Sequence, residues 1–173
     1  MRILTILLAA LLVIGLAPTV RAFTFLAIDG GSYDLEGWRG QPVLVVNTPP
    51  LCDPVPQYAA MEALNGTYAP RGLVVVAVPS DDFAEEVNDD AAVVDECHRR
   101  LGVDVAWTRV TSVLGEDAHP FYLWLAEEYG VEPTWNFNKV LIGPEGEFLA
   151  FWTSTTRLDS PEITGMIEAH LPR

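Results

Sequence analysis

Cysteine is scarce in this chain, whose 173 residues contain only Cys52 and Cys97 and no Cys-x-x-Cys pair. The lack of that pair excludes the usual dithiol oxidoreductase motif. The two cysteines, His98 and His119 show none of the common zinc-ligand spacings, so we expect no metal site. In an exported protein, two cysteines are first interpreted as one structural disulfide, and their surroundings must decide whether they have another role.

Basic residues are also few, since 10 Lys and Arg stand against 24 Asp and Glu, a formal net charge of −14. Such a surface repels phosphate backbones and anionic lipid. We therefore expect neither nucleic acid nor a membrane surface as a partner. The same charge offers little general attraction for glutathione, which is an anion at neutral pH.

Long apolar runs are absent after the first 22 residues. Met1-Arg2 is a short positive start, residues 3–16 are mostly apolar, and Pro18 is followed by small residues at 20–22. This layout predicts a secretory signal peptide over residues 1–22, with export to the bacterial periplasm or beyond. The alternative is a retained membrane anchor. Cleavage would leave 8 basic residues against 24 acidic ones, a net charge of −16, in a single domain over 23–173.

Hydrophobic patterning predicts an α/β domain. Two buried, β-branched strands are separated by a helix, which requires a crossover and makes part of the sheet parallel. A hairpin near the C-terminus adds antiparallel strands, so the sheet is mixed. The thioredoxin-like sandwich is one fold with this arrangement of strands and helices. Strands are expected over 23–28, 42–46, 73–78, 139–142 and 147–152. Helices are expected from Pro54 or Pro56 to Gly72, over 91–101 and 120–129, and from Ser160-Pro161 onward.

Cys52 lies between a buried strand and the start of a helix. The free N–H groups and the dipole of a helix N-terminus stabilise an anion. A thiol at that place has a lowered pKa, and the thiolate is the nucleophilic form. Its position therefore makes Cys52 the candidate nucleophile.

Segment 45–58 around this cysteine resembles the redox signature of the glutathione peroxidase family. In that family an apolar strand ends in Asn, and the redox Cys or selenocysteine follows five residues later. The matching positions here are Asn47, Cys52, Pro56, Gln57 and Tyr58.

Three further segments resemble the family in the same order. Val78-Pro79-Ser80-Asp81-Asp82-Phe83 is similar to Phe-Pro-Cys-Asn-Gln-Phe, and His119-Pro120-Phe121-Tyr122 to His-Pro-Leu-Tyr. Trp135-Asn136-Phe137-Asn138-Lys139 is similar to Trp-Asn-Phe-x-Lys. The four segments span most of the chain after residue 22.

The resemblance implies a thioredoxin-like three-layer sandwich with a mixed central sheet and a thiol peroxidase activity without a cofactor. Cys52 would attack the peroxide, while the indole N–H of Trp135 and the carboxamide of Asn136 stabilise the thiolate and the leaving oxygen. Cys97 occupies a position like that of the resolving cysteine of two-cysteine members. The implied reductant is a thioredoxin-like dithiol or glutathione. The short stretch between residues 125 and 135 is typical of the compact form, so we expect a monomer.

Two carboxylates depart from the family pattern. Asp82 stands at the position of the family's active-site Gln, and Asp53 replaces the Gly after the redox residue. A carboxylate near the sulfur would raise the pKa of the thiol. Three hypotheses follow: a peroxidase, a redox sensor or partner-binding domain whose Cys52–Cys97 disulfide is a switch, and a domain with a purely structural disulfide.

Overall fold

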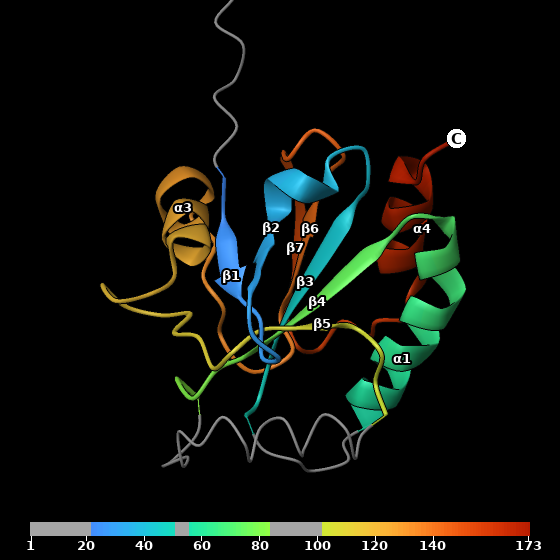
Figure 1. Ribbon diagram of the computed structural model, residues 1–173. Coiled ribbons are helices and arrows are strands. Elements are labelled where there is room, and N and C mark those ends of the chain that lie inside the picture. The colour runs from blue at the N-terminus through green and yellow to red at the C-terminus, as the bar shows by residue number, and fades with distance from the viewer. Residues whose placement is uncertain (1–21, 51–55, 84–101) are drawn as a thin grey trace, which may run out of the picture.

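The computed structural model describes residues 22–50, 56–83 and 102–173 (Figure 1). The main sheet has five strands in the order β5-β4-β3-β6-β7. Its strands are β3 (Val43–Thr48), β4 (Val74–Pro79), β5 (Ala106–Trp107), β6 (Lys139–Ile142) and β7 (Phe148–Trp152). A separate two-stranded ribbon consists of β1 (Thr24–Leu26) and β2 (Ser32–Asp34). The helices are η1 (Leu35–Trp38), α1 (Pro56–Tyr68), η2 (Ala69–Arg71), α3 (Pro120–Tyr129) and α4 (Pro161–His170).

The main sheet is mixed, as the sequence predicts. β3 is parallel to β4 and antiparallel to β6, and β6 continues into the antiparallel β7. At the centre, Val46 lies opposite Ala77 on one side and Lys139 on the other. The end of β3 and the start of β6 therefore lie side by side at one pole of the sheet.

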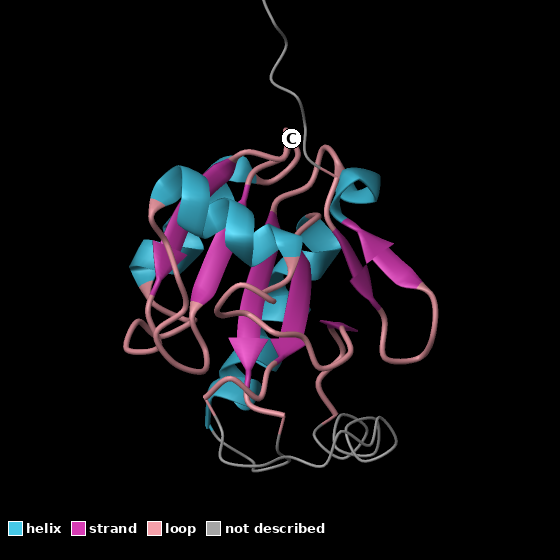
Figure 2. Ribbon diagram, turned by 90° about the vertical axis from the view of Figure 1, so that its left-hand side faces the viewer, coloured by secondary structure: helices cyan, strands magenta, loops and turns pink. Residues whose placement is uncertain are grey.

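Helices cover both faces of this sheet. Figure 1 shows α1 and α4 together on one side and α3 on the other, and Figure 2 shows α3 crossing in front of the strands. Each face has its own buried apolar cluster, one packed under α1 and α4 and one under α3. The predicted three-layer α/β architecture is confirmed.

The central strand β3 is buried on both faces, which explains its unbroken apolar run. Leu44 and Val46 point to the α1 and α4 side, while Val43 and Val45 point to the α3 side. Because successive side chains of a strand alternate between faces, one short segment contributes to both clusters.

The helix boundaries follow from local chemistry. The apolar positions with helical spacing in α1, at residues 58, 61, 64 and 68, are all buried. Ser160 caps α4 by accepting a hydrogen bond from the N–H of Ile163, with Pro161 as first helical residue, as predicted. Gly130 ends α3 with φ of 64°, a left-handed conformation that favours glycine.

His119 begins α3 as its N-cap. Its Nδ1 accepts the N–H of Phe121 at 3.2 Å, and its Nε2 lies 3.0 Å from the carbonyl oxygen of Thr24. The imidazole also stacks on Phe25, with ring centroids 4.1 Å apart. Burial lowers the pKa of His119. The neutral ring therefore joins the first strand of the ribbon to α3.

Some expected elements differ from the structure. The first strand is shorter than the expected 23–28, and β2 and β5 were not expected. β2 is polar and partly exposed, and β5 has two residues, so neither has a run long enough to show a period. The expected helix over 91–101 lies outside the described residues.

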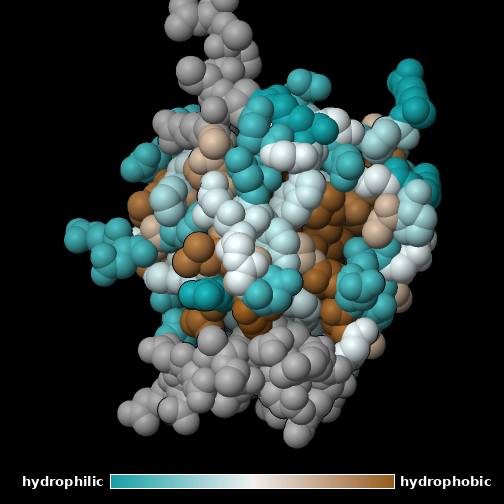
Figure 3. Space-filling view, in the orientation of Figure 1, coloured by the Kyte–Doolittle hydropathy of each residue, from teal (hydrophilic) through white to brown (hydrophobic). Residues whose placement is uncertain are grey.

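Within the described ranges, no helix has the length and hydropathy needed to cross a bilayer. The predicted signal peptide lies almost entirely in residues 1–21, which are outside those ranges. On the face shown in Figure 3, apolar side chains appear between the β1–β2 ribbon and α1, and hydrophilic residues surround them.

Candidate active site

Trp135 lies in the loop between α3 and β6, near the end of β3. Trp135 is 56% exposed. The ring of Phe83, which follows β4, packs beside it with ring centroids 5.9 Å apart. The two rings form a small aromatic surface at this end of the sheet.

A cavity of about 580 Å³ lies beside Trp135 and Asn136. Its other walls come from the start of α1 and from the 154–159 loop, and Ala60 and Leu158 make part of it apolar. Oδ1 of Asn136 and Oε1 of Gln57 are buried without a hydrogen-bond partner among the described residues. Because buried polar atoms are nearly always paired, these two oxygens are available to a water or a ligand. The volume lies in the range of small-molecule sites.

Lys139 forms part of the cavity wall from the first position of β6. The side chain is 1% exposed, and its Nζ donates to the carbonyl oxygens of Thr156 at 2.5 Å and Thr153 at 3.3 Å. Burial lowers its pKa to about 8. Lys139 therefore holds the turn that forms the far wall of the cavity.

Asp82 is engaged in hydrogen bonds with the loop that precedes α3. Its carboxylate accepts from Ser80 Oγ at 2.9 Å and Ser112 Oγ at 3.2 Å. It also accepts the backbone N–H groups of Val113 at 2.5 Å and Leu114 at 3.1 Å. These bonds anchor the end of β4 to the 112–114 loop, so in this structure Asp82 acts as a loop anchor at the position where the family has Gln.

Three residues of the predicted site are not placed. Cys52, Asp53 and Cys97 lie outside the described residues. Their neighbours do converge, because β3 leads toward Cys52 and ends beside the Trp135–Asn136 loop, and α1 begins at Pro56.

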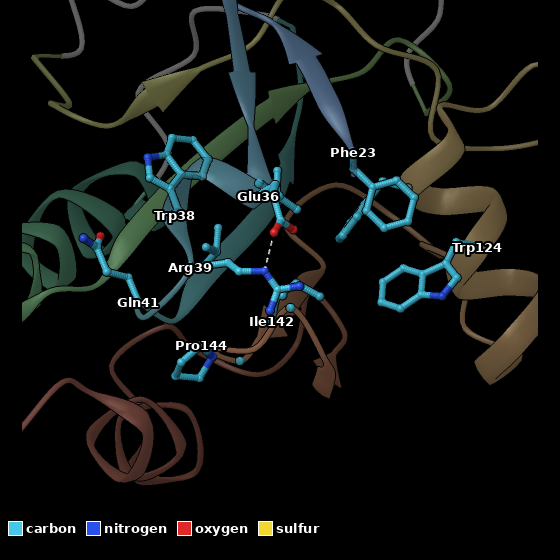
Figure 4. A pocket seen from close by; sticks show the side chains of 13 residues that line it. Phe23, Glu36, Trp38, Arg39, Gln41, Trp124, Ile142 and Pro144 are labelled. Carbon is cyan, nitrogen blue, oxygen red and sulfur yellow. Dashed lines mark hydrogen bonds and ion pairs between the residues drawn. The ribbon is translucent and has the colours of Figure 1, made fainter. Parts of the chain in front are cut away.

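A second cavity lies at the opposite pole of the sheet and on its α3 face (Figure 4). It is lined by aromatic rings of Phe23, Trp38 and Trp124, and Arg39 pairs there with Glu36 at 2.5 Å. Its volume of about 20 Å³ has room for about one water molecule. It is far smaller than the cavity beside Trp135 and lies at the other end of the strands.

Comparison with known proteins matches residues 20–126 to the sequence profile of glutathione peroxidases. The chain belongs to the glutathione peroxidase family. Glutathione peroxidase 7 of Bos taurus is 32% identical over 149 residues, which cover 84% of this chain and 80% of that protein. Hydroperoxy fatty acid reductase Gpx2 of Synechocystis is 31% identical over 145 residues, which cover 83% of this chain and 94% of that protein. The crystal structure of Trgpx in apo form has a TM-score of 0.68 at 28% identity, covering 86% of this chain and 92% of that one.

The predicted family is thereby confirmed, and with it the peroxidase class of oxidoreductase. The thioredoxin-like fold is confirmed as well. Its β-α-β unit is β3-α1-β4, and its antiparallel hairpin with a final helix is β6-β7-α4. The Trgpx structure has the same fold over 86% of this chain.

Sequence reasoning assigned no role to Asn47, Gln57 or Lys139, although all three fall on motif positions. For Asn47 and Lys139, the sequence does contain a signal, which is a polar residue next to an apolar run. Asn47 is a carboxamide inside an apolar strand, and Lys139 is a charge directly before three apolar residues. Polar residues at such positions are buried and must be paired.

Proposed function

We propose that this protein is a thiol peroxidase in which Cys52 reduces hydrogen peroxide or a small organic hydroperoxide. The observation that carries the proposal is the hydrogen bond that holds the Trp135–Asn136 loop against Asn47 of β3, five residues before Cys52. The N-terminus of α1 supports a thiolate there, since its free N–H groups and dipole favour negative charge.

In the first step the Cys52 thiolate attacks one oxygen of the hydroperoxide, and the O–O bond breaks. The sulfur becomes a sulfenic acid, and the leaving oxygen takes a proton to become water or an alcohol. Donors from Trp135 and Asn136 would stabilise the charge on that oxygen. In the second step the Cys97 thiol attacks the sulfenic sulfur and releases water, giving a disulfide. A thioredoxin-like dithiol, or glutathione, then reduces this disulfide by thiol exchange.

Peroxide titration of the reduced protein tests the first step. We expect fast formation of a sulfenic acid at Cys52, mapped by mass after trapping with a carbon-acid nucleophile, and none in Cys52→Ser. Trp135→Phe and Asn136→Ala should each slow this oxidation about tenfold or more. Wild-type rates in both variants would contradict the assigned roles.

The cavity supports organic hydroperoxides as substrates in addition to hydrogen peroxide. Ala60 of α1 lines it, whereas the neighbouring Ala59 is exposed and does not. We expect Ala60→Trp to raise KM for cumene hydroperoxide and to leave the rate with hydrogen peroxide nearly unchanged. Ala59→Trp is the matched control. Equal effects of both variants would exclude the cavity as the hydroperoxide site.

A redox sensor is the second candidate, and Asp82 in place of the family's Gln favours it. A sensor would form the Cys52–Cys97 disulfide slowly and would not turn over with a dithiol. A disulfide that a mild dithiol does not reduce would instead indicate the structural role. Steady-state turnover with thioredoxin and a peroxide distinguishes these outcomes from the peroxidase.

We also propose that the chain is exported and acts as a monomer. The first 22 residues support export, and N-terminal sequencing of the mature protein should find a start near Phe23. An intact Met1 would contradict cleavage. The short segment between α3 and β6 supports the monomer, which sedimentation at working concentration can test.

A further inference from the structure

Asn47 connects the strand that leads to Cys52 with the loop that carries Trp135 and Asn136. Its Nδ2 donates to the carbonyl oxygen of Trp135 at 3.0 Å, and its Oδ1 accepts the N–H of Asn138 at 3.1 Å. Its backbone adds two bonds, from its own N–H to the Asn138 carbonyl at 3.2 Å and from the Phe137 N–H to its carbonyl at 2.6 Å. Asn47 therefore forms hydrogen bonds with three residues of the loop, Trp135, Phe137 and Asn138.

Asn138 completes this arrangement. Its Nδ2 also donates to the carbonyl of Trp135, and its Oδ1 accepts from Thr134 Oγ1 at 3.3 Å. Asn47 and Asn138 are each 2% exposed. The Trp135 carbonyl thus accepts from two buried carboxamides, which fixes the peptide between Trp135 and Asn136 where water is largely excluded.

The loop has an unfavourable backbone that this network maintains. Phe137 has φ of 62°, in the left-handed region that residues other than glycine seldom adopt. Its buried ring packs edge-on against Tyr58, with centroids 5.2 Å apart, and the Tyr58 hydroxyl donates to the carbonyl of Pro49. Strained backbone persists only where surrounding contacts determine it, and such strain is concentrated at functional sites.

We propose that Asn47 is a positioning residue of the peroxidase site, which fixes the loop that carries the Trp135 indole and the Asn136 carboxamide. The inference rests on the proposed function. The position requires a donor and an acceptor about 3 Å from two backbone groups at once, and a carboxamide supplies both. An aspartate supplies acceptors alone, and an apolar residue supplies neither.

The test is Asn47→Asp, which keeps the size and the acceptor of the side chain but places a carboxylate oxygen against the Trp135 carbonyl. We expect hydrogen peroxide to oxidise Cys52 at least tenfold more slowly in this variant. Asn65→Asp is the matched control, because Asn65 also donates a side-chain hydrogen bond to a backbone carbonyl, that of Asp104, away from the cavity. Its rate should stay within twofold of wild type.

Tryptophan fluorescence supplies a readout that a general loss of stability would not change. Of the five tryptophans, Trp107, Trp124 and Trp152 are buried, Trp38 is partly buried and Trp135 is 56% exposed. In a Trp38→Phe background, acrylamide quenching therefore mainly reports Trp135. We expect the quenching constant to change in Asn47→Asp and not in Asn65→Asp. An unchanged constant together with an unchanged oxidation rate would overturn the proposal.

A double-mutant cycle separates positioning from an independent structural role. If Asn47 acts through the loop, Asn47→Asp should change the rate less than twofold in a Trp135→Phe, Asn136→Ala background. A tenfold loss in that background would overturn the proposal. If Asn47→Asp does not fold, Asn138→Asp, which removes the other bond to the Trp135 carbonyl, takes its place in the same cycle. Wild-type rates in the Trp135→Phe, Asn136→Ala background alone would instead refute the proposed function.

Discussion

Removal of the Asp82 carboxylate should destabilise the protein through the loop that it anchors. Asp82→Ala deprives the N–H groups of Val113 and Leu114 of their acceptor, and two serine hydroxyls of a partner. The hydroxyls can rotate toward water. The Val113 N–H cannot do so as easily, since Val113 is buried.

The size of the expected loss in stability follows from the N–H groups of Val113 and Leu114. Hydrogen bonds to a charged group contribute about 1.5–3 kcal/mol each when water is excluded. Asp82 itself is exposed, so water can replace part of the stabilisation that these two hydrogen bonds provide. We therefore expect Asp82→Ala to lower the free energy of unfolding by about 2 kcal/mol. For a domain of this size, that lowers Tm by about 4–8 °C. Asp82→Asn keeps one oxygen for both N–H groups and should cost less, about 0.5–1 kcal/mol.

Urea and thermal unfolding of Asp82→Ala and Asp82→Asn measure the loss in the free energy of unfolding and in Tm, with Asp81→Ala as control. Asp81 is the exposed neighbour, and its removal should change the free energy of unfolding by less than about 0.5 kcal/mol. If Asp82→Ala unfolds at the same urea concentration as Asp81→Ala, the carboxylate does not anchor the loop and the argument is wrong.

Three further predictions concern recycling and pH. Cys97→Ser should leave the peroxide oxidation of Cys52 intact and block recycling by a dithiol, so normal turnover with thioredoxin would exclude the resolving role. Burial lowers the pKa of His119, so its contribution to stability is full above about pH 6.5 and is lost as the pH falls through the folded-state pKa. Between about pH 7.5 and pH 5, wild type should lose more Tm than His119→Asn, which keeps a capping oxygen, and equal losses would contradict this. Burial also lowers the pKa of Lys139 from 10.5 to about 8, so the unfolded chain binds more protons in that window and stability rises with pH. Relative to Lys139→Met, wild type should gain about 2 kcal/mol between about pH 7.5 and pH 10, and parallel pH profiles would refute it.

Much of the fold could be predicted because its signals are local. The apolar run of β3 indicates a strand buried on both faces, and the spacing from Tyr58 to Tyr68 indicates one helix face. Ser160 and Gly130 mark helix ends through hydrogen bonds and backbone angles that involve only their neighbours. Each of these features is set within a few residues.

The contacts that organise the candidate site could not be predicted, because they join distant segments. Three of the four donors to Asp82 come from residues 30 to 32 positions away, so its anchoring role is not visible in its own motif. The sequence does show Trp135 and Asn136 as motif residues. It does not show that Asn47 holds their loop, since that depends on the pairing of β3 with β6.

Asn47 and Trp135 are 88 residues apart in the chain and meet only when β6 pairs with β3. The β6–β7 hairpin closes over a short turn, whereas the β3–β6 pairing must close a long loop, and such long-range closures limit folding rates. During refolding, peroxide reduction should therefore not recover before this pairing has formed. A newly made chain would gain its reactive geometry only once β3 and β6 have met.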